Sequence, residues 1–235
     1  MSAIPQEINH ISARKLSSET LPTIAIIIPA LNEADSIAAA LTHVQNLSGW
    51  HECLVTDGGS DDLTRVIACA HPLRPRVITA LGGRATQLNV ALNHVTSDVV
   101  VILSVDCRLG RHALMAIRHA VAQGAVAGCL RLHNSSSRFL FRVHDHWARL
   151  RARWTNGAYV DQAPFFLRAL ALKHRFRQLA GYDTADLGRR MNQGRTLPVI
   201  NSSVVASCRH WHRHGLWRGT WMHQQLRLRY WYRHL

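Results

Sequence analysis

The chain has 235 residues, 47% of them hydrophobic and 18% charged, so it can bury a substantial core and is not globally disordered. Its 28 Lys and Arg residues against 14 Asp and Glu residues give a net charge of +14, which favours anionic partners such as phosphates or acidic lipid. The five cysteines are scattered without C-x-x-C spacing, which excludes a zinc ribbon or disulfide framework and favours a reducing compartment.

The first 22 residues are polar and lack the apolar core of a signal peptide, so we expect residues 1–22 to be a mobile leader. No apolar stretch approaches the roughly 18 residues that a membrane span needs. These features predict a cytoplasmic protein, with a peripheral position at the inner face of the membrane as the open alternative.

Strands and helices alternate between residues 23 and 110. A β-branched run from Thr23, the segment ECLVTD, the segment PRVITAL and the segment SDVVVILSVD are typical of strands, and the first three are each followed by a helical pattern. This alternation predicts an open, mostly parallel α/β sheet flanked by helices, with right-handed crossovers.

The pattern changes after residue 125. The segment AVAGCLRL predicts a further strand, FLFRVHDHWARLRARW predicts a helix, and YVDQAPFFLRALAL predicts a strand, a turn and a short helix. Residues 216–235 place aromatic and aliphatic side chains at rough helical spacing among arginines, which predicts a basic amphipathic helix. Such a helix suits either an acidic membrane surface or packing on the sheet.

Polar residues follow successive strands at the edge where open α/β sheets bind ligands. Asn32 and Glu33, Asp57 and Gly58, Arg84, and Asp106 all fall there. In isolation each has an ordinary explanation as a turn former, helix cap or solvated charge. Together they could contact one nucleotide, with the amino terminus of the helix after Arg84 facing a phosphate.

The ordered motifs carry a more specific resemblance. The chain resembles family 2 glycosyltransferases of the GT-A fold, and is most similar to the short bacterial radical-SAM/selenobiotic-associated subgroup. The resemblance runs from about Thr23 to the C-terminus through IIIPALNEADSI, VTDGGSDD, GGRATQLN, LSVDCRL, YVDQAPFFLR and CRHWHRHGLWR. It implies a domain over residues 23–215, with a nucleotide-binding half (23–110) and an acceptor half (111–215).

The resemblance also implies roles for individual residues. The residues expected beside the nucleotide are Pro29, Asn32, Glu33, Asp57, Gly58, Arg84 and Asn89. Asp106 matches the last aspartate of the D-x-D-type signature, which implies that it coordinates Mg²⁺ or Mn²⁺ on the donor diphosphate. Asp161 and Gln162 match the acceptor-region G-D-Q segment, with Val160 in place of the glycine.

Two departures from the subgroup pattern concern the metal and the catalytic base. Ser104 and Cys107 stand where the subgroup carries other polar residues, which implies a sparse metal site. Thr184 falls where the usual base would stand, so Asp183 and Asp186 are the candidates for that role. The alternatives are Asp183 as a helix cap and Asp186 as an ion-pair partner of Arg189 or Arg190.

We therefore predict an inverting glycosyltransferase that uses a nucleotide-diphosphate sugar, UDP-linked by analogy, and an unknown hydroxyl acceptor that could be lipid-linked. The alternative is a catalytically impaired scaffold of the same fold that binds nucleotide or membrane. Because no RNA- or DNA-binding motif is present, nucleic acid is not expected as a partner.

Overall fold

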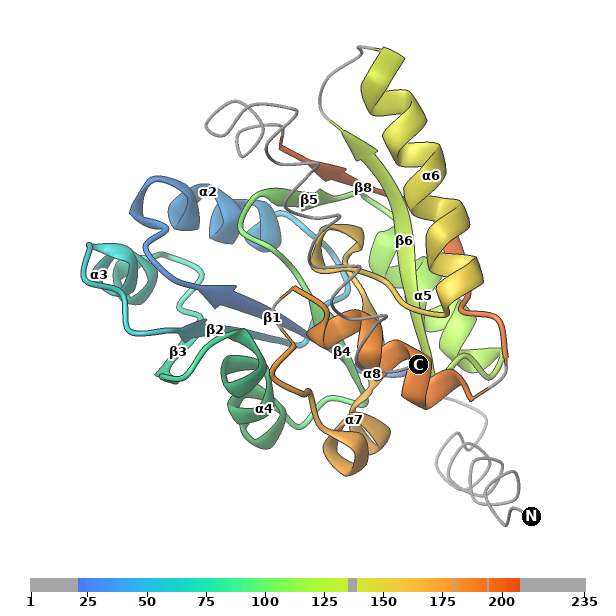
Figure 1. Cartoon of the computed structure of the whole chain (residues 1–235). Helices are drawn as coiled ribbons and strands as arrows, with labels where there is room; N and C mark the ends of the chain where they lie inside the picture. Colours follow the sequence, from blue (N-terminus) through green and yellow to red (C-terminus); the bar gives the residue numbers. More distant parts are fainter. Residues whose placement is uncertain (1–20, 135–138, 180, 194, 208–235) are drawn as a thin grey trace.

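The computed structural model describes residues 21–134, 139–179, 181–193 and 195–207 (Figure 1). Most of the predicted leader and all of the predicted C-terminal helix lie outside these residues. No helix in the described part of the chain is long and apolar enough to cross a membrane.

The first half of the chain forms the parallel part of the sheet, in the strand order β3-β2-β1-β4. The strands are β1 (Ile24–Ala30), β2 (Glu52–Asp57), β3 (Arg76–Thr79) and β4 (Val99–Ile102). The helices between them are α2 (Ala34–Gln45), α3 (Thr64–Ala70) and α4 (Arg84–His94). The predicted alternation of strands and helices is confirmed.

The second half extends the same sheet in the order β7-β6-β8-β5. These strands are β7 (Phe165–Leu167), β6 (Ala127–Asn134), β8 (Val199–Ala206) and β5 (Cys107–Leu109). β7 is antiparallel to both β4 and β6, and β5 is antiparallel to β8, whereas β6 and β8 are parallel. The α/β class is confirmed, and the antiparallel pairs are confined to this half.

The remaining helices surround the second half of the sheet. They are α5 (Ala113–Ala122), α6 (Phe139–Thr155), the 3₁₀ turn η1 (Val160–Gln162), α7 (Arg168–His174) and α8 (Asp183–Asn192). Figure 1 shows α6 running alongside β6, and α7 and α8 lying on the α4 side of the sheet.

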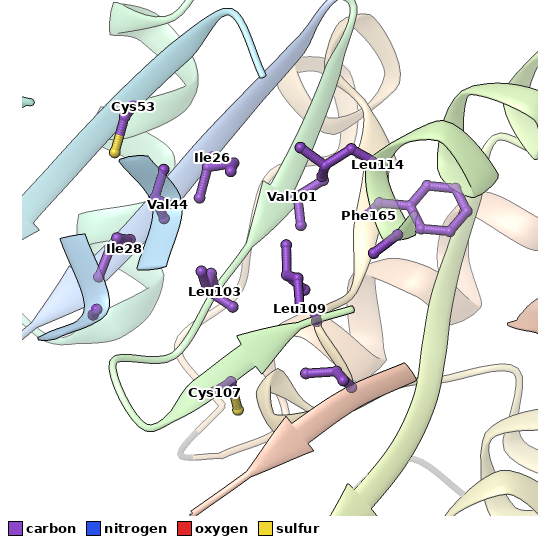
Figure 2. Close-up of a cluster of buried hydrophobic side chains, with 14 of the residues drawn as sticks. Ile26, Ile28, Val44, Cys53, Val101, Leu103, Cys107, Leu109, Leu114 and Phe165 are labelled. Atoms are coloured by element: carbon purple, nitrogen blue, oxygen red, sulfur yellow. The ribbon is translucent and has the colours of Figure 1, made fainter. Parts of the chain in front are cut away.

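The core lies on both faces of the sheet because the strand period of two sends successive side chains to opposite faces. Ile26 and Ile28 of β1 pack with Val44 of α2 on one face (Figure 2). Ile27 packs with Leu88 of α4 on the other. All five are fully buried, and each contributes about 1.5–3 kcal/mol through its removal from water. This double core explains why these strands read as continuous apolar runs.

Candidate active site

The carboxyl ends of the parallel strands meet at one edge of the sheet. Ala30, the last residue of β1, is level with Asp57 of β2, and Asp57 is level with Thr79 of β3. β4 lies on the other side of β1 and ends at Ile102, level with Ile27. The predicted polar residues that follow these strands therefore share this edge.

Hydrogen bonds tie the loop after β1 to the loop after β2. The backbone N–H of Asn32 donates to Ser60 Oγ at 3.0 Å, and the Asp61 N–H donates to Asn32 Oδ1 at 3.1 Å. Glu33 N–H donates to Thr64 Oγ1 at 2.7 Å. Asn32 has a positive φ of 54°, a backbone conformation that asparagine tolerates better than most residues. The two loops thus form one braced unit.

Asp57 is almost fully buried, with an exposed fraction of 2%. Its carboxylate accepts hydrogen bonds from the Ser60 hydroxyl at 2.5 Å and from the backbone N–H groups of Gly59 and Ser60, at 3.2 Å to Oδ2. The turn-forming explanation for Asp57 is therefore present in the structure. The hydrogen bonds of the Asp57 carboxylate also help to fix Gly58, which leads out of β2 toward the carboxyl edge of the sheet.

Gln87 holds the ends of β1 and β2 together, a role that the sequence did not predict. Its buried side-chain amide donates to the carbonyl oxygens of Ala30 at 2.9 Å and Thr56 at 2.7 Å. A Cβ atom at Gly58 would lie 3.0 Å from this amide, so glycine allows the close approach. The sequence feature that could have indicated this role is a glutamine on the inward face of a helical pattern.

Arg84 and Asp183 form a two-point ion pair between residues 99 positions apart. Arg84 Nε lies 2.8 Å from Asp183 Oδ2 and its Nη2 lies 3.1 Å from Oδ1. The Asp183 side chain is 4% exposed and the Arg84 side chain 30%. The Thr184 N–H also donates to Asp183 Oδ1 at 2.7 Å. Both oxygens of Asp183 are engaged, and α4 is joined to α8 at their amino termini.

Asn89 and Asp186 also make contacts within the protein. The Asn89 amide group donates to the Phe176 carbonyl at 2.8 Å and accepts from the Phe176 N–H at 2.9 Å. Asp186 lies 2.8 Å from Arg190 Nε and 4.0 Å from Arg177, which agrees with the ion-pair alternative stated for it. Asn89 and Asp186 thereby fasten the segment before α8 to the rest of the domain.

The segments that carry Asp106 and Asp161 run side by side because β4 and β7 pair in antiparallel orientation. Val101 pairs with Phe165, and the Ile102 N–H donates to the Pro164 carbonyl at 2.9 Å, so the chain after β4 runs beside the chain before β7. The thiol of Cys107 donates to the Asp161 carbonyl at 3.7 Å. Asp161 thus lies against the residue that follows Asp106.

One carboxylate oxygen at this place is unusual. Among the described residues, Oδ1 of Asp161 is the one carboxylate oxygen that is fully buried and has no hydrogen-bond partner. Asp161 as a whole is partly buried, as is Asp106. An unpaired buried polar atom is costly, which makes Asp161 a candidate to contact a bound group.

Cys107 is not a plausible ligand for a cation. Burial, with the nearby charges of Asp161 and Asp106, raises the pKa of the Cys107 thiol far above its usual range. The thiol therefore stays protonated and keeps its contact with the Asp161 carbonyl. The oxygen-bearing side chains near it are Asp106, Asp161 and Ser104.

Gln162 is fully buried, unlike its neighbour Asp161. Its Oε1 accepts from Arg151 Nη2 at 3.2 Å, and its amide nitrogen donates to the Ala148 carbonyl at 3.4 Å. The Arg151 guanidinium lies 4.0 Å above the Tyr159 ring. Gln162 therefore anchors η1 to α6 and so helps to place Asp161.

No cluster of three or more His, Cys, Asp or Glu side chains suited to a metal occurs in the described part of the chain. A pocket of about 260 Å³ lies at the opposite edge of the sheet, lined by residues 50–54, 73–76 and Val95. It is remote from the strand ends that carry the polar loops, so it is not part of this site.

The braced loops at the carboxyl edge and the flanking helices define a GT-A α/β protein. The sequence profile described as Glycosyl transferase family 2 matches residues 25–182, and the chain belongs to that family. Membership confirms the predicted family and enzyme class. The narrower radical-SAM-associated subgroup stays a prediction.

Two curated relatives are similar over part of their length. A 4,4'-diaponeurosporenoate glycosyltransferase of Staphylococcus haemolyticus is 27% identical over 50% of this chain and 33% of its own. An undecaprenyl-phosphate 4-deoxy-4-formamido-L-arabinose transferase of Edwardsiella ictaluri is 26% identical over 59% of this chain and 44% of its own. The chain thus spans less than half the length of either relative.

Solved structures share the fold at low identity. A Pyrobaculum calidifontis mannosyltransferase in complex with GDP-Man and Mn²⁺ has a TM-score of 0.59 and 22% identity, covering 86% of this chain and 64% of its own. S. aureus TarS with UDP-GlcNAc has a TM-score of 0.58 and 14% identity, covering 79% and 58%. Glucosyl-3-phosphoglycerate synthase from Mycobacterium tuberculosis, with Mn²⁺ and UDP, has a TM-score of 0.54 and 20% identity, covering 83% and 74%.

Proposed function

We propose that this protein transfers a sugar from a nucleotide-diphosphate sugar to an acceptor hydroxyl, with inversion at the anomeric carbon. The observation that best supports this activity is the pair of loops after β1 and β2, which hydrogen bonds hold together at the same sheet edge as Asp106 and Asp161. This arrangement offers a rigid site for a nucleoside beside oxygen ligands for its diphosphate.

The nucleoside lies against the loops after β1 and β2 in this proposal. Asn32 and Asp57 hold those loops in place, and Pro29, Glu33 and Gly58 line the same edge. The donor is proposed to be UDP-linked, since two of the structural neighbours above hold UDP or a UDP-sugar, although one holds GDP-Man.

A divalent cation, Mg²⁺ or Mn²⁺, fits the residues beside the proposed diphosphate position. Asp106 is a hard oxygen donor, and the protonated thiol of Cys107 does not compete with it for the ion. Asp106 would hold the ion, which when bound neutralises charge on the leaving diphosphate. Few protein ligands suffice because Mg²⁺ keeps waters and phosphate oxygens in its shell.

The transfer requires a group that accepts the proton of the acceptor hydroxyl. The acceptor oxygen bonds to the anomeric carbon, the bond from that carbon to the diphosphate oxygen breaks, and its electron pair leaves with the nucleotide. We assign the proton to Asp161, whose carboxylate is partly exposed and forms no ion pair among the described residues. Asp183 and Asp186 are held in ion pairs, and the proposal gives them positioning roles through Arg84 and Arg190.

The acceptor is proposed to be lipid-linked, with the protein at an acidic membrane surface inside the cell. The support is the name of one relative, which is an undecaprenyl-phosphate transferase, together with the net charge of +14.

Calorimetric titration of the protein with UDP, GDP and CDP, each with and without Mn²⁺, tests the proposed function. We expect UDP to bind tightest and its affinity to depend on Mn²⁺. Failure of every nucleotide to bind in the presence of Mn²⁺ would sink the proposal.

A further inference from the structure

Two tryptophans on α6 are exposed to an extent that is unusual for such large apolar side chains. Trp147 is 46% exposed and Trp154 is 72% exposed. Their ring centroids are 6.0 Å apart and the planes make an angle of 88°, an edge-to-face contact. The pair therefore forms one contiguous aromatic patch, and patches of this kind mark interaction sites.

The patch points away from the body of the protein. α6 packs on β6 (Figure 1). Ala148, Arg151 and Ala152 of this helix are buried. Trp147 and Trp154 are seven residues apart, two helical turns, and so lie on one stripe of the helix, beside the buried stripe and exposed to solvent. The packing of α6 on the sheet therefore does not explain why Trp147 and Trp154 are tryptophans.

Basic side chains accompany the aromatic rings. His146 and Arg153 are both exposed, and each immediately precedes one of the two tryptophans. Residues 146–155 contain no Asp or Glu, and Arg149 adds a further, partly buried cation. Indole rings favour the depth of lipid headgroups, where guanidinium groups can bind lipid phosphates.

We propose that this face of α6, defined by His146, Trp147, Arg153 and Trp154, binds the surface of an anionic lipid bilayer with the helix lying along it. Charge complementarity selects this occupant, because the face and the whole chain are cationic. A second copy of the same face would bring like charges together. The inference deepens the proposed membrane association and names its surface, but it needs neither donor nor acceptor.

Sedimentation of the full chain with vesicles tests the proposal. We compare vesicles of phosphatidylcholine containing phosphatidylglycerol with vesicles of phosphatidylcholine alone. The wild type should partition onto the anionic vesicles, and the double variant Trp147→Ser, Trp154→Ser should partition roughly tenfold less. The aromatic and basic residues after position 207 are unchanged in this variant, so the loss isolates α6.

A matched control is the double variant Leu63→Ser, Val66→Ser, which removes two equally exposed apolar side chains, 63% and 62%, from another surface. It should sediment like the wild type, and circular dichroism should give all three proteins the same melting curve. The proposal is overturned if the wild type does not partition, if it ignores lipid charge, or if the tryptophan variant partitions like the control. Loss of a dimer in the tryptophan variant would instead assign the face to self-association. UDP binding measured on the same samples separates this failure from failure of the proposed function.

Discussion

Asp161 and Asp183 differ in what surrounds their carboxylates, and on that difference we propose Asp161 rather than Asp183 as the base. Asp183 is held at both oxygens by Arg84, while Oδ1 of Asp161 has no hydrogen-bond partner among the described residues. An acid locked in a two-point pair with a guanidinium is a poor base, because protonation must first break the pair.

The two residues can be separated by kinetics. Asp161→Asn should lower the rate of UDP release from a UDP-sugar by about 10²–10⁴-fold and leave the dissociation constant of UDP nearly unchanged. Asp183→Asn should lower thermal stability more than the Asp161 variant does, since it disrupts a buried ion pair. A rate that survives in Asp161→Asn but disappears in Asp183→Asn, at equal stability, would return the base role to Asp183.

His43 gives a residue-scale prediction about pH. Its Nε2 accepts the Leu109 N–H at 2.8 Å, which fastens β5 to the end of α2 and requires a neutral ring. Burial, followed by the charge of Arg108, lowers the pKa of His43 below its ordinary value of 6.5. The unfolded chain therefore binds the proton first. The stabilising contribution is complete above about pH 6.5 and declines as the pH falls toward the folded-state pKa.

Urea denaturation at several pH values between about 5.5 and about 7.5 measures this effect. His43→Gln keeps a hydrogen-bond acceptor without titrating, so its free energy of unfolding should fall less steeply toward acid than that of the wild type. Part of the pH dependence of stability should remain in the His43→Gln variant, because burial also lowers the pKa of His174. Identical slopes for variant and wild type would rule out the account of His43.

At the scale of elements, the parallel strands β1, β2 and β4 and the helices between them could be predicted from sequence. Their apolar runs and the helical patterns that follow are local signals, and the residues of the site at their carboxyl ends followed from them. β5 and β8 could not be predicted this way. β5 has three residues, and β8 contains the polar run Asn201, Ser202 and Ser203, so neither has a local period. Their pairing is set by tertiary contacts.

Contacts between distant residues of the candidate site were equally beyond prediction from local sequence patterns. The Arg84–Asp183 pair and the Cys107–Asp161 contact join residues far apart in the chain, and no local pattern predicts such contacts. Asp186 is the reverse case, because its pairing with Arg190 follows from i,i+4 spacing alone. The sequence therefore predicts which polar residues follow the strands, but not the distant partners of Asp183 and Asp161.

At the scale of the whole molecule, we propose that the carboxyl edge of the sheet binds a nucleotide diphosphate with a divalent cation. Calorimetric titration of UDP in the presence of Mn²⁺ tests it most directly, comparing wild type with Asp106→Asn. Glu52→Gln is the matched carboxylate-to-amide control, since Glu52 lies at the opposite edge of the sheet, where its carboxylate accepts hydrogen bonds from Thr96 and Ser97. Loss of these bonds should lower stability by about 1–3 kcal/mol.

The account predicts that Asp106→Asn weakens UDP binding by at least roughly tenfold in Mn²⁺ and abolishes most of the Mn²⁺ dependence. Glu52→Gln should keep the wild-type dissociation constant of UDP. Equal, Mn²⁺-dependent UDP affinity in wild type and Asp106→Asn would contradict the claim.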